Sequence, residues 1–239
     1  MCFASLERRS TVEHAGERLR LAENPGLVVV DVGCGSGGFV RWMRKRGADP
    51  IGVECEPGLR KEAMRLDAAH SASYLDGVGQ DLPIADDRAD AATFLSSLHH
   101  VPAEHMLRSL REAARVVRPG GMVYVCEPVP EGPAFEVGRL IDDETAVRRS
   151  AQEALEVAGD QIFDLVEAGR FLDQATYRDA DAFGRLAVGI DPARAEHYAT
   201  VKDDVADAFA RHGRQIDLGF VFDQPKQFHL LQVTGSETN

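Results

Sequence analysis

Short continuous runs of apolar residues, separated by amphipathic stretches, fill the first half of the chain. Leu27–Val32 is a continuous valine-rich run, which predicts a strand buried on both faces. Further strands are expected at Asp49–Glu54, Ser73–Val78, Ala91–Leu95 and Met122–Cys126, with helices at Phe39–Arg46, Gly58–Ala69 and His105–Val117. Because strands and helices alternate through short connections, the pattern predicts an α/β fold with a doubly wound, mostly parallel sheet.

The flanking segments follow different patterns. Apolar positions at helical spacing within residues 1–26 predict a lead-in helix that stops at Asn24-Pro25-Gly26. Further downstream, helices are expected at Asp142–Ala158, Asp179–Val188 and Ala193–His212, with a strand within Phe163–Tyr177. Gln215–Phe222 and Gln227–Val233 alternate around turn residues at 223–226, which predicts a C-terminal antiparallel hairpin.

These patterns predict a single domain that spans residues 1–239, a length sufficient for a core with an insertion. Its expected parts are the lead-in helix at 1–26, the core at 27–127, a mainly helical cap insertion at 128–212, and the terminal hairpin at 213–239.

Charge and cysteine content narrow the class of protein. The net charge of −12 argues against non-specific nucleic-acid binding, which needs a concentrated surface of lysine and arginine. The N-terminal residues lack the apolar segment of a signal peptide, and no apolar run is long enough to span a bilayer. The cysteines have no metal-like spacing and suit free thiols in a reducing compartment, so we expect a cytoplasmic protein without membrane or nucleic-acid partners: Cys2, Cys34, Cys55 and Cys126.

A glycine-rich turn follows the first expected strand and opens the next helix. Glycine tolerates positive φ and allows a ligand to approach the backbone closely. The spacing Gly33-x-Gly35-x-x-Gly38 also fits the dinucleotide fingerprint, so the glycines alone leave two classes of cofactor open. Asp31, immediately before the turn, would repel a pyrophosphate and attract an ammonium group. Glu54 ends the second strand, where an acid can accept hydrogen bonds from both ribose hydroxyls of either cofactor.

Five segments in order resemble the class I S-adenosylmethionine (SAM)-dependent methyltransferases, most closely the small-molecule, type 11 branch. The resemblance covers roughly residues 27–127 and implies a Rossmann-like fold. The segments are Val29–Gly37, Gly52-Val-Glu-Cys-Glu-Pro57, Gln80-Asp-Leu-Pro-Ile84 followed by Asp90, Ser97-Leu-His-His-Val-Pro102 and Arg115-Val-Val-Arg-Pro-Gly-Gly121.

The resemblance implies that SAM is the cofactor and assigns residues to its parts. The methionine end of SAM is assigned to Asp31 and the turn residues Gly33, Cys34, Gly35 and Gly37. The ribose and adenine are assigned to Glu54, Cys55, Gln80, Asp81 and Leu82. Many relatives carry an acid where this chain has Val78, so the sequence leaves open whether Gln80 or Asp81 contacts adenine. The region beneath the methyl donor is assigned to Leu95, Ser96 and His99 at the tip of the fourth strand.

Methyl transfer to an O–H or N–H⁺ acceptor can require a base, which suits a histidine. His99 and His100 are the catalytic candidates by position, and the sequence does not separate them. His14 lies on the lead-in helix, which could close over SAM, and the alternative is a surface histidine. Glu127 ends the fifth strand and could reach the acceptor, and the alternative is a bond to nearby backbone. No metal site is expected, because no third ligand stands at suitable spacing.

The sequence therefore predicts a SAM-dependent methyltransferase that acts on a small-molecule acceptor. Two other functions explain some or all of these sequence features. A nucleotide (NAD)-dependent oxidoreductase explains the glycines and Glu54 but not Asp31 or the Arg-Pro-Gly-Gly turn. A non-catalytic SAM-binding protein explains every binding feature and lacks a productive acceptor site. The sequence does not decide between a monomer and a homodimer.

Overall fold

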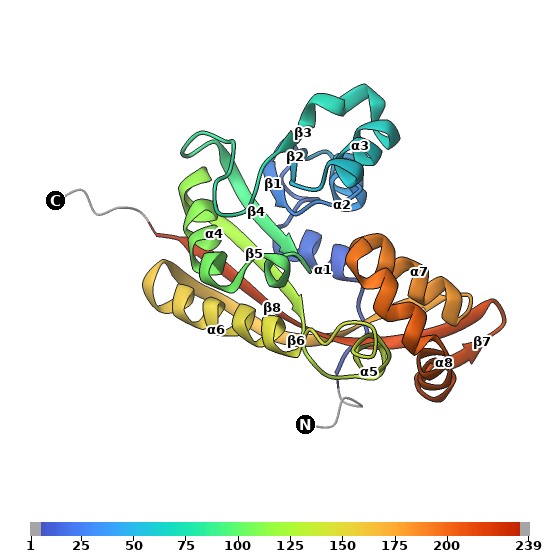
Figure 1. Cartoon of the computed structure of the whole chain (residues 1–239). Coiled ribbons are helices and arrows are strands. Elements are labelled where there is room, and N and C mark those ends of the chain that lie inside the picture. Colours follow the sequence, from blue (N-terminus) through green and yellow to red (C-terminus); the bar gives the residue numbers. More distant parts are fainter. Residues whose placement is uncertain (1–5, 235–239) are drawn as a thin grey trace. The chain divides into compact units, whose positions relative to one another are not determined.

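A computed structural model describes residues 6–234 of the chain (Figure 1). The chain divides into two compact units. The larger unit consists of Thr11–Glu127, Ser150–Gly169 and Gln227–Asn239. The smaller unit consists of Met1–Ser10, Pro128–Arg149 and Arg170–Lys226. Residues 150–169, which the sequence assigns to the cap segment, thus group with the larger unit.

Within residues 6–234, eight strands form one sheet, and the larger unit contains its parallel part. Their bounds are β1 (Val28–Val32), β2 (Asp49–Glu54), β3 (Tyr74–Asp76), β4 (Ala89–Leu95), β5 (Val117–Pro128), β6 (Phe163–Tyr177), β7 (Arg214–Ile216) and β8 (Gly219–Val233). The order is β3-β2-β1-β4-β5-β8-β6, with β7 paired to β8. The pairs from β3 through β5 are parallel, which confirms the predicted α/β fold. The order reverses between β1 and β4, the point at which such sheets bind ligands.

The helices follow the predicted pattern closely in the first half of the chain. Their bounds are α1 (Thr11–Arg18), α2 (Gly38–Arg44), α3 (Pro57–Leu66), α4 (Ala103–Val116), α5 (Pro133–Gly138), α6 (Thr145–Gln161), α7 (Ala180–Ile190) and α8 (Ala195–His212). The lead-in helix was predicted too long, since α1 ends before Arg20, whose φ of 53° is incompatible with a continuing helix. Residues 1–5 of that predicted helix lie outside the described residues.

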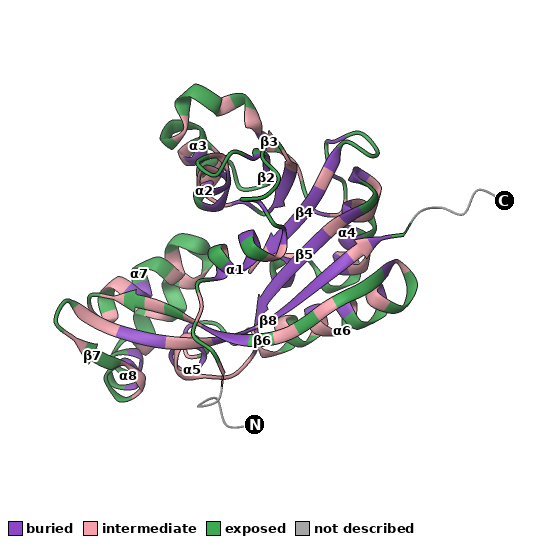
Figure 2. Cartoon of the chain, turned by 180° about the vertical axis from the view of Figure 1, so that it is seen from behind, coloured by how far each residue is buried: buried purple, intermediate pink, exposed green. Residues whose placement is uncertain are grey.

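The two faces of the parallel sheet in the larger unit are covered by different helices (Figures 1 and 2). Successive side chains of a strand point to opposite faces. On one face, Phe94 and Val123 belong to an apolar cluster that includes residues of α4 and α6. On the other face, Tyr124 contacts His14 of α1. Figure 2 shows that buried residues dominate β4 and β5, as expected for strands covered on both sides.

The smaller unit has an apolar core of its own, with a group of aromatic rings among aliphatic side chains. Phe209 lies at its centre, with ring centroids 4.8 Å from Phe222, 6.0 Å from Phe183 and 5.0 Å from Phe220. Val137 and Ile141, from α5 and the turn after it, pack into the same cluster.

The predicted hairpin is wrong in the position of its turn. Residues 223–226 are part of the continuous strand β8, and the chain reverses instead at Asp217-Leu218, where β7 pairs antiparallel with β8. Turn-forming residues remain extended here because the backbone of this stretch is paired: Val129 N–H donates to the carbonyl of Pro225 at 3.2 Å. Gly219, with φ of 139°, supplies the conformation that the actual turn requires. In the described part of the chain, no helix has the length and apolar character needed to cross a membrane.

Candidate functional site

The turn between β1 and α2 depends on glycine for both conformation and space. Gly33, Gly35 and Gly37 all have positive φ, at 72°, 54° and 76°. A Cβ at Gly33 would lie 2.6 Å from Cβ of Ser97, and one at Gly37 would lie 2.6 Å from the Tyr74 ring. Gly38 has neither constraint, since a Cβ there meets nothing within 4 Å. The structure thus requires the first and third glycines of Gly33-x-Gly35-x-Gly37, whereas the last glycine of the dinucleotide fingerprint is dispensable.

Glu54 holds this turn from the neighbouring strand. Its carboxylate is 7% exposed and accepts hydrogen bonds from the N–H of Gly35 and the N–H of Glu56, both at 2.8 Å. The residue that the sequence assigns to a ribose therefore also fixes the shape of the glycine turn. Its position at the carboxyl end of β2 brings it to the same edge of the sheet as the turn.

Asp31 is a buried acid at the point where the sheet order reverses. Its side chain is 3% exposed and accepts a hydrogen bond from the hydroxyl of Thr93 at 2.8 Å. Burial raises the pKa of Asp31 to about 7; the Thr93 bond acts in the opposite direction, and the nearby negative charge of Glu54 adds to the rise. Among the described residues Asp31 forms no ion pair. A buried carboxyl group of this kind is suited to a cationic ligand that enters from outside the protein.

A row of polar side chains runs from Asp31 to α1 through the otherwise apolar sheet face. Strand register places Asp31 beside Thr93, and Thr93 beside Tyr124. The Tyr124 hydroxyl lies 2.7 Å from Nδ1 of His14, which is 2% exposed on α1. Because these side chains share one face, α1 covers the same face as the Asp31 carboxyl group. His14, considered from the sequence alone as a surface residue or part of a lid, is thus a buried contact of this helix.

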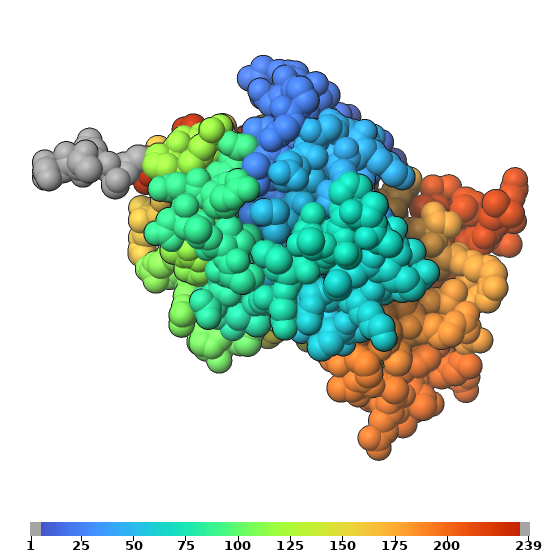
Figure 3. Space-filling view, turned by 90° about the horizontal axis from the view of Figure 1, so that it is seen from above, coloured from blue at the N-terminus to red at the C-terminus, as the bar shows by residue number. Residues whose placement is uncertain are grey.

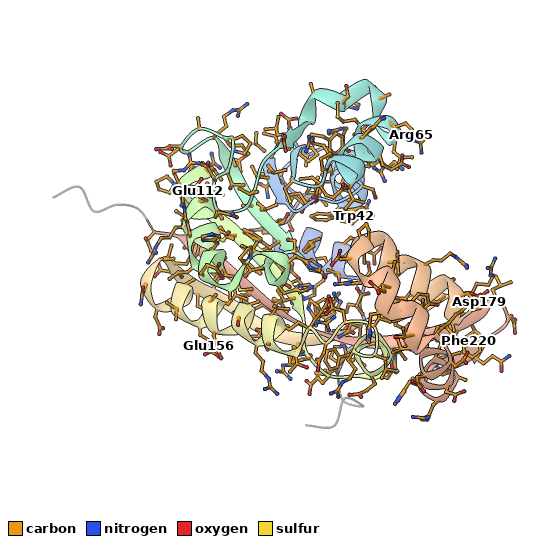
Figure 4. All side chains as sticks on the ribbon, viewed as in Figure 1. Trp42, Arg65, Glu112, Glu156, Asp179 and Phe220 are labelled. Carbon is orange, nitrogen blue, oxygen red and sulfur yellow. The ribbon has the colours of Figure 1, made fainter. Side chains whose placement is uncertain are left out.

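The helix α1 also packs against α2, which begins at the glycine turn. A Cβ at Gly16 of α1 would lie 2.4 Å from the Trp42 ring, so the ring rests directly on the helix backbone (Figure 4). Arg46 in turn lies over the same ring, 3.6 Å from its centroid. The lead-in segment is therefore anchored to two elements of the candidate site, β5 and α2.

The two cysteines near the turn have different surroundings. Cys34 is buried in a small apolar cluster with Val40 and Tyr74, and burial raises the pKa of its thiol. A Cβ at Gly52 would lie 2.7 Å from its sulfur, so Cys34 fills the space between β1 and β2. Cys55 is exposed at the end of β2, where a ligand held by Glu54 can reach it.

The segment assigned to adenine is positioned by α4. Leu82 N–H donates to Glu112 at 2.9 Å, and Arg115 donates to the carbonyls of Leu82 and Ile84 at 3.1 and 2.8 Å. Arg115 and Glu112 are themselves joined by two hydrogen bonds, and Glu112 is labelled in Figure 4. This pair lowers the pKa of Glu112 and raises that of Arg115. The sequence does not identify Glu112, although Arg115 lies in a segment that carries the resemblance.

Within this segment the three predicted residues differ in exposure. Asp81 is exposed, Gln80 is half-buried and Leu82 is only 3% exposed, as part of the main apolar core. The segment follows β3 in the larger unit, and Figure 3 views the face on which the chain from α2 to β4 lies at the surface. The choice between Gln80 and Asp81 stays open, whereas the Leu82 side chain belongs to the core and its backbone groups bond Glu112 and Arg115.

The tip of β4 is locked onto the glycine turn. Ser97 donates its hydroxyl proton to the carbonyl of Val32 at 2.6 Å, while its Cβ packs against Gly33. Ser96, with φ of 56°, turns the chain after Leu95 and donates its N–H to the carbonyl of Cys126 at 2.8 Å. Leu95 and Ser96 are both half-buried. The residues predicted to lie beneath the methyl donor thus adjoin the turn predicted to hold its methionine end.

Glu127 joins this tip to the end of β5. The carboxylate is fully buried and accepts hydrogen bonds from the N–H groups of Ser97 and Leu98, at 3.1 and 2.9 Å. Its second oxygen pairs with Nδ1 of His99, a ring that is 4% exposed. His100 is exposed, and its ring centroid lies 4.1 Å from that of His99. The structure therefore separates two histidines that the sequence leaves equivalent.

Sequence reasoning missed Thr93 and Ser97, which make direct contacts with Asp31 and Gly33. Thr93 is a polar residue within the apolar run Ala91–Leu95, and this interruption was an available signal. Ser97 opens one of the segments that carry the resemblance, but its bond to Val32, more than sixty positions away in the chain, cannot be seen in the sequence.

Comparison with known proteins gives consistent results. Residues 30–125 match a family described as "Methyltransferase domain". The chain is 35% identical over 126 residues to the demethylmenaquinone methyltransferase of Corynebacterium kroppenstedtii, covering 52% of each chain. It is 34% identical over 123 residues to the malonyl-[acyl-carrier protein] O-methyltransferase of Pectobacterium atrosepticum, covering 51% of this chain and 45% of the other. The chain thus spans about half the length of the curated relatives it matches.

A solved structure extends the similarity in fold beyond the matched segment. A SAM-dependent methyltransferase from Geobacter sulfurreducens in complex with S-adenosylhomocysteine has a TM-score of 0.57, with 20% sequence identity and coverage of 93% of this chain and 90% of the other. The family match includes Asp31, the glycine turn, Glu54, the adenine segment and the β4 tip. Residues 30–125 therefore match a methyltransferase-domain family, and the similarity in fold extends over most of the chain.

Proposed function

We propose that this protein transfers a methyl group from SAM to a small-molecule acceptor. The observation that carries the proposal is Asp31, a buried carboxyl group without an ion-pair partner among the described residues, placed next to a glycine turn at the point where the strand order reverses. The α-ammonium group of SAM would supply the positive charge that pairs with this carboxylate. A pyrophosphate at the same place would be repelled.

Two further features support SAM as the ligand. Glu54, at the end of β2, is positioned to accept from ribose hydroxyls while its turn contacts stay in place. The 80–84 segment, which α4 holds in shape, offers backbone and side-chain groups to adenine. SAM supplies an electrophilic methyl group on a sulfonium, and the protein's own contribution is to orient that group and to exclude water from it.

The catalytic base is proposed to be one of the histidines at the β4 tip, as the sequence suggests. Position supports both His99 and His100, because both follow the turn that Ser97 locks onto Gly33. A neutral imidazole accepts a proton from a hydroxyl or ammonium acceptor as the new bond to carbon forms.

Calorimetry tests the choice of cofactor. SAM, S-adenosylhomocysteine and NADH are titrated into the wild-type protein, into Glu54→Ala, and into Glu156→Ala as a control at an exposed acid on α6. We expect SAM and S-adenosylhomocysteine to bind and Glu54→Ala to weaken both by at least about tenfold, since a charged hydrogen-bond acceptor contributes about 1.5–3 kcal/mol. Binding of NADH alone would overturn the proposal in favour of an oxidoreductase.

A second measurement addresses the non-catalytic alternative. Release of S-adenosylhomocysteine is followed with hydroxyl, amine and carboxylate acceptors of similar size. Two of the relatives are a demethylmenaquinone methyltransferase and a malonyl-[acyl-carrier protein] O-methyltransferase. We expect at least one acceptor class to stimulate release, and the Asp31→Ala variant to abolish it. SAM binding without release for any acceptor would favour a SAM-binding protein that lacks catalysis.

A further inference from the structure

Glu127 makes two kinds of contact at once. One carboxylate oxygen accepts the backbone N–H groups of Ser97 and Leu98, and the other pairs with Nδ1 of His99. The group is fully buried, at the end of β5, and comes from a strand adjacent to β4. A buried carboxylate is stable only when its lone pairs are used, and here three donors use them.

The contact with Nδ1 decides which ring nitrogen of His99 carries the proton. An ionised carboxylate can only accept, so Nδ1 must be the donor and must keep its hydrogen. In the neutral ring the other nitrogen, Nε2, then carries no proton and is the atom that can accept one. When Nε2 becomes protonated, the positive ring remains next to the negative Glu127, which stabilises it.

The backbone contacts determine where this ring stands. Glu127 fixes the N–H groups of Ser97 and Leu98, and Ser97 is in turn fixed against Val32 and Gly33 of the glycine turn. His99 is therefore attached to the turn of the methyl donor through a short chain of buried contacts. His100 is exposed, and its ring lies tilted against that of His99 at an interplanar angle of 39°.

We propose that Glu127 is a positioning residue that holds His99 in the Nδ1–H tautomer, so that Nε2 of His99 is the proton-accepting atom of the site. The function assigned to Nε2 rests on the proposed methyl transfer. The contact between Glu127 and His99 is present without any ligand. The acceptor proton passes to Nε2 as the acceptor atom bonds to the methyl carbon, and the electron pair of the broken carbon–sulfur bond remains on sulfur.

In Glu127→Gln the side chain keeps its shape, but the group that faces Nδ1 of His99 changes from a hydrogen-bond acceptor to a donor. The single amide oxygen must serve the two backbone N–H groups, so the amide NH₂ then faces Nδ1 of His99. A ring that receives a hydrogen bond at Nδ1 must carry its proton on Nε2. The variant therefore exchanges the tautomer, whereas Glu127→Ala leaves two backbone donors unpaired in the interior and risks misfolding.

The test is nitrogen NMR of the full chain labelled with ¹⁵N-histidine, with His99→Gln used to assign the signals. At alkaline pH we expect the wild-type His99 ring to be in the Nδ1–H form, and the Glu127→Gln ring in the Nε2–H form. On acidification the wild-type ring should gain its proton at Nε2, and the variant ring at Nδ1. Glu156→Gln, at an exposed acid, should retain the wild-type pattern.

Calorimetry with SAM, run on the same samples, keeps this inference distinct from the proposed function. We expect the wild type and Glu156→Gln, a substitution at an exposed acid on α6, to bind SAM with equal affinity. An Nε2–H ring in the wild type, or an unchanged tautomer in Glu127→Gln, would overturn the assignment to Glu127. Failure of wild-type protein to bind SAM would instead contradict the proposed function and leave the tautomer result intact.

Discussion

At the carboxyl ends of β1, β2, β4 and β5 the larger unit buries ionisable side chains, whereas the core of the smaller unit combines aromatic rings with aliphatic side chains. Asp31, Glu54, His99 and Glu127 are each less than a tenth exposed. In the smaller unit the corresponding interior is occupied by Phe183, Phe209 and Phe222 with aliphatic neighbours.

The difference shows how the two regions divide between stability and chemistry. Burial of a carboxyl group costs free energy unless hydrogen bonds or a cation compensate it, so a protein retains such groups where they serve a ligand or a reaction. Aromatic burial stabilises without such a cost. Substitutions in the first region should therefore change binding more than stability, and those in the second should do the reverse.

The largest effect is expected at Gly33. In Gly33→Ala the new Cβ meets Ser97 at 2.6 Å, with φ at 72°, so the turn and the β4 tip must separate. We expect loss of SAM binding by more than about a hundredfold in calorimetry, given a backbone cost of about 1–3 kcal/mol before the steric clash is added.

Gly38→Ala is the matched control, because its Cβ meets nothing within 4 Å. Affinity close to wild type is expected there. A loss at Gly38 as severe as that at Gly33 would contradict this account of the turn and favour a dinucleotide site.

In the smaller unit, Phe222→Ala should act on stability alone. The ring is fully buried and lies 4.8 Å from that of Phe209. We expect denaturant unfolding to show a loss of about 3–5 kcal/mol, as is usual for removal of a buried phenylalanine, with SAM affinity within about twofold of wild type. Leu218→Ala, at a side chain that is 86% exposed, is the control and should change little. A large loss of SAM affinity in folded Phe222→Ala would remove the contrast between the two regions.

The pH dependence of SAM affinity should report on Asp31. Its pKa is raised to about 7, so the unliganded protein binds a proton that an ionised, ligand-binding Asp31 must release. Affinity should therefore rise by about tenfold per pH unit up to about pH 7 and level off above it. The unliganded protein should lose stability as the pH rises from about 4 to 7, because the unfolded state already carries an ionised aspartate there.

Asp31→Asn provides the comparison for this measurement. It should bind SAM weakly, with a flat affinity profile across the same pH range, when both are measured by calorimetry. An unchanged slope in Asp31→Asn would assign the pH dependence to a different group.

The smallest effect is expected at the adenine segment. Arg115→Lys retains the charge but cannot bond Glu112 and both the Leu82 and Ile84 carbonyls together. We expect SAM affinity to fall by about tenfold, from loss of about one to two hydrogen bonds that hold the segment. Arg111→Lys, at an exposed arginine of the same helix, should bind normally. Equal affinities of the two variants would show that the segment does not need this support.

The sequence by itself determined the α/β core and the residues of its glycine turn. Apolar runs such as Leu27–Val32 specify buried strands, and the short connections leave few ways to arrange them. The turn residues Gly33 to Gly37 and the acids Asp31 and Glu54 are close in the chain or lie at consecutive strand ends, so spacing alone brings them together.

Tertiary structure decided what depends on distant contacts. Pairing of the backbone kept residues 223–226 extended, although their composition predicts a turn. Glu127 gave His99 a buried partner and left His100 exposed, which two adjacent histidines cannot reveal in a sequence. Local propensity and spacing are properties of neighbouring residues, whereas hydrogen-bond partners across strands exist only once the sheet has formed.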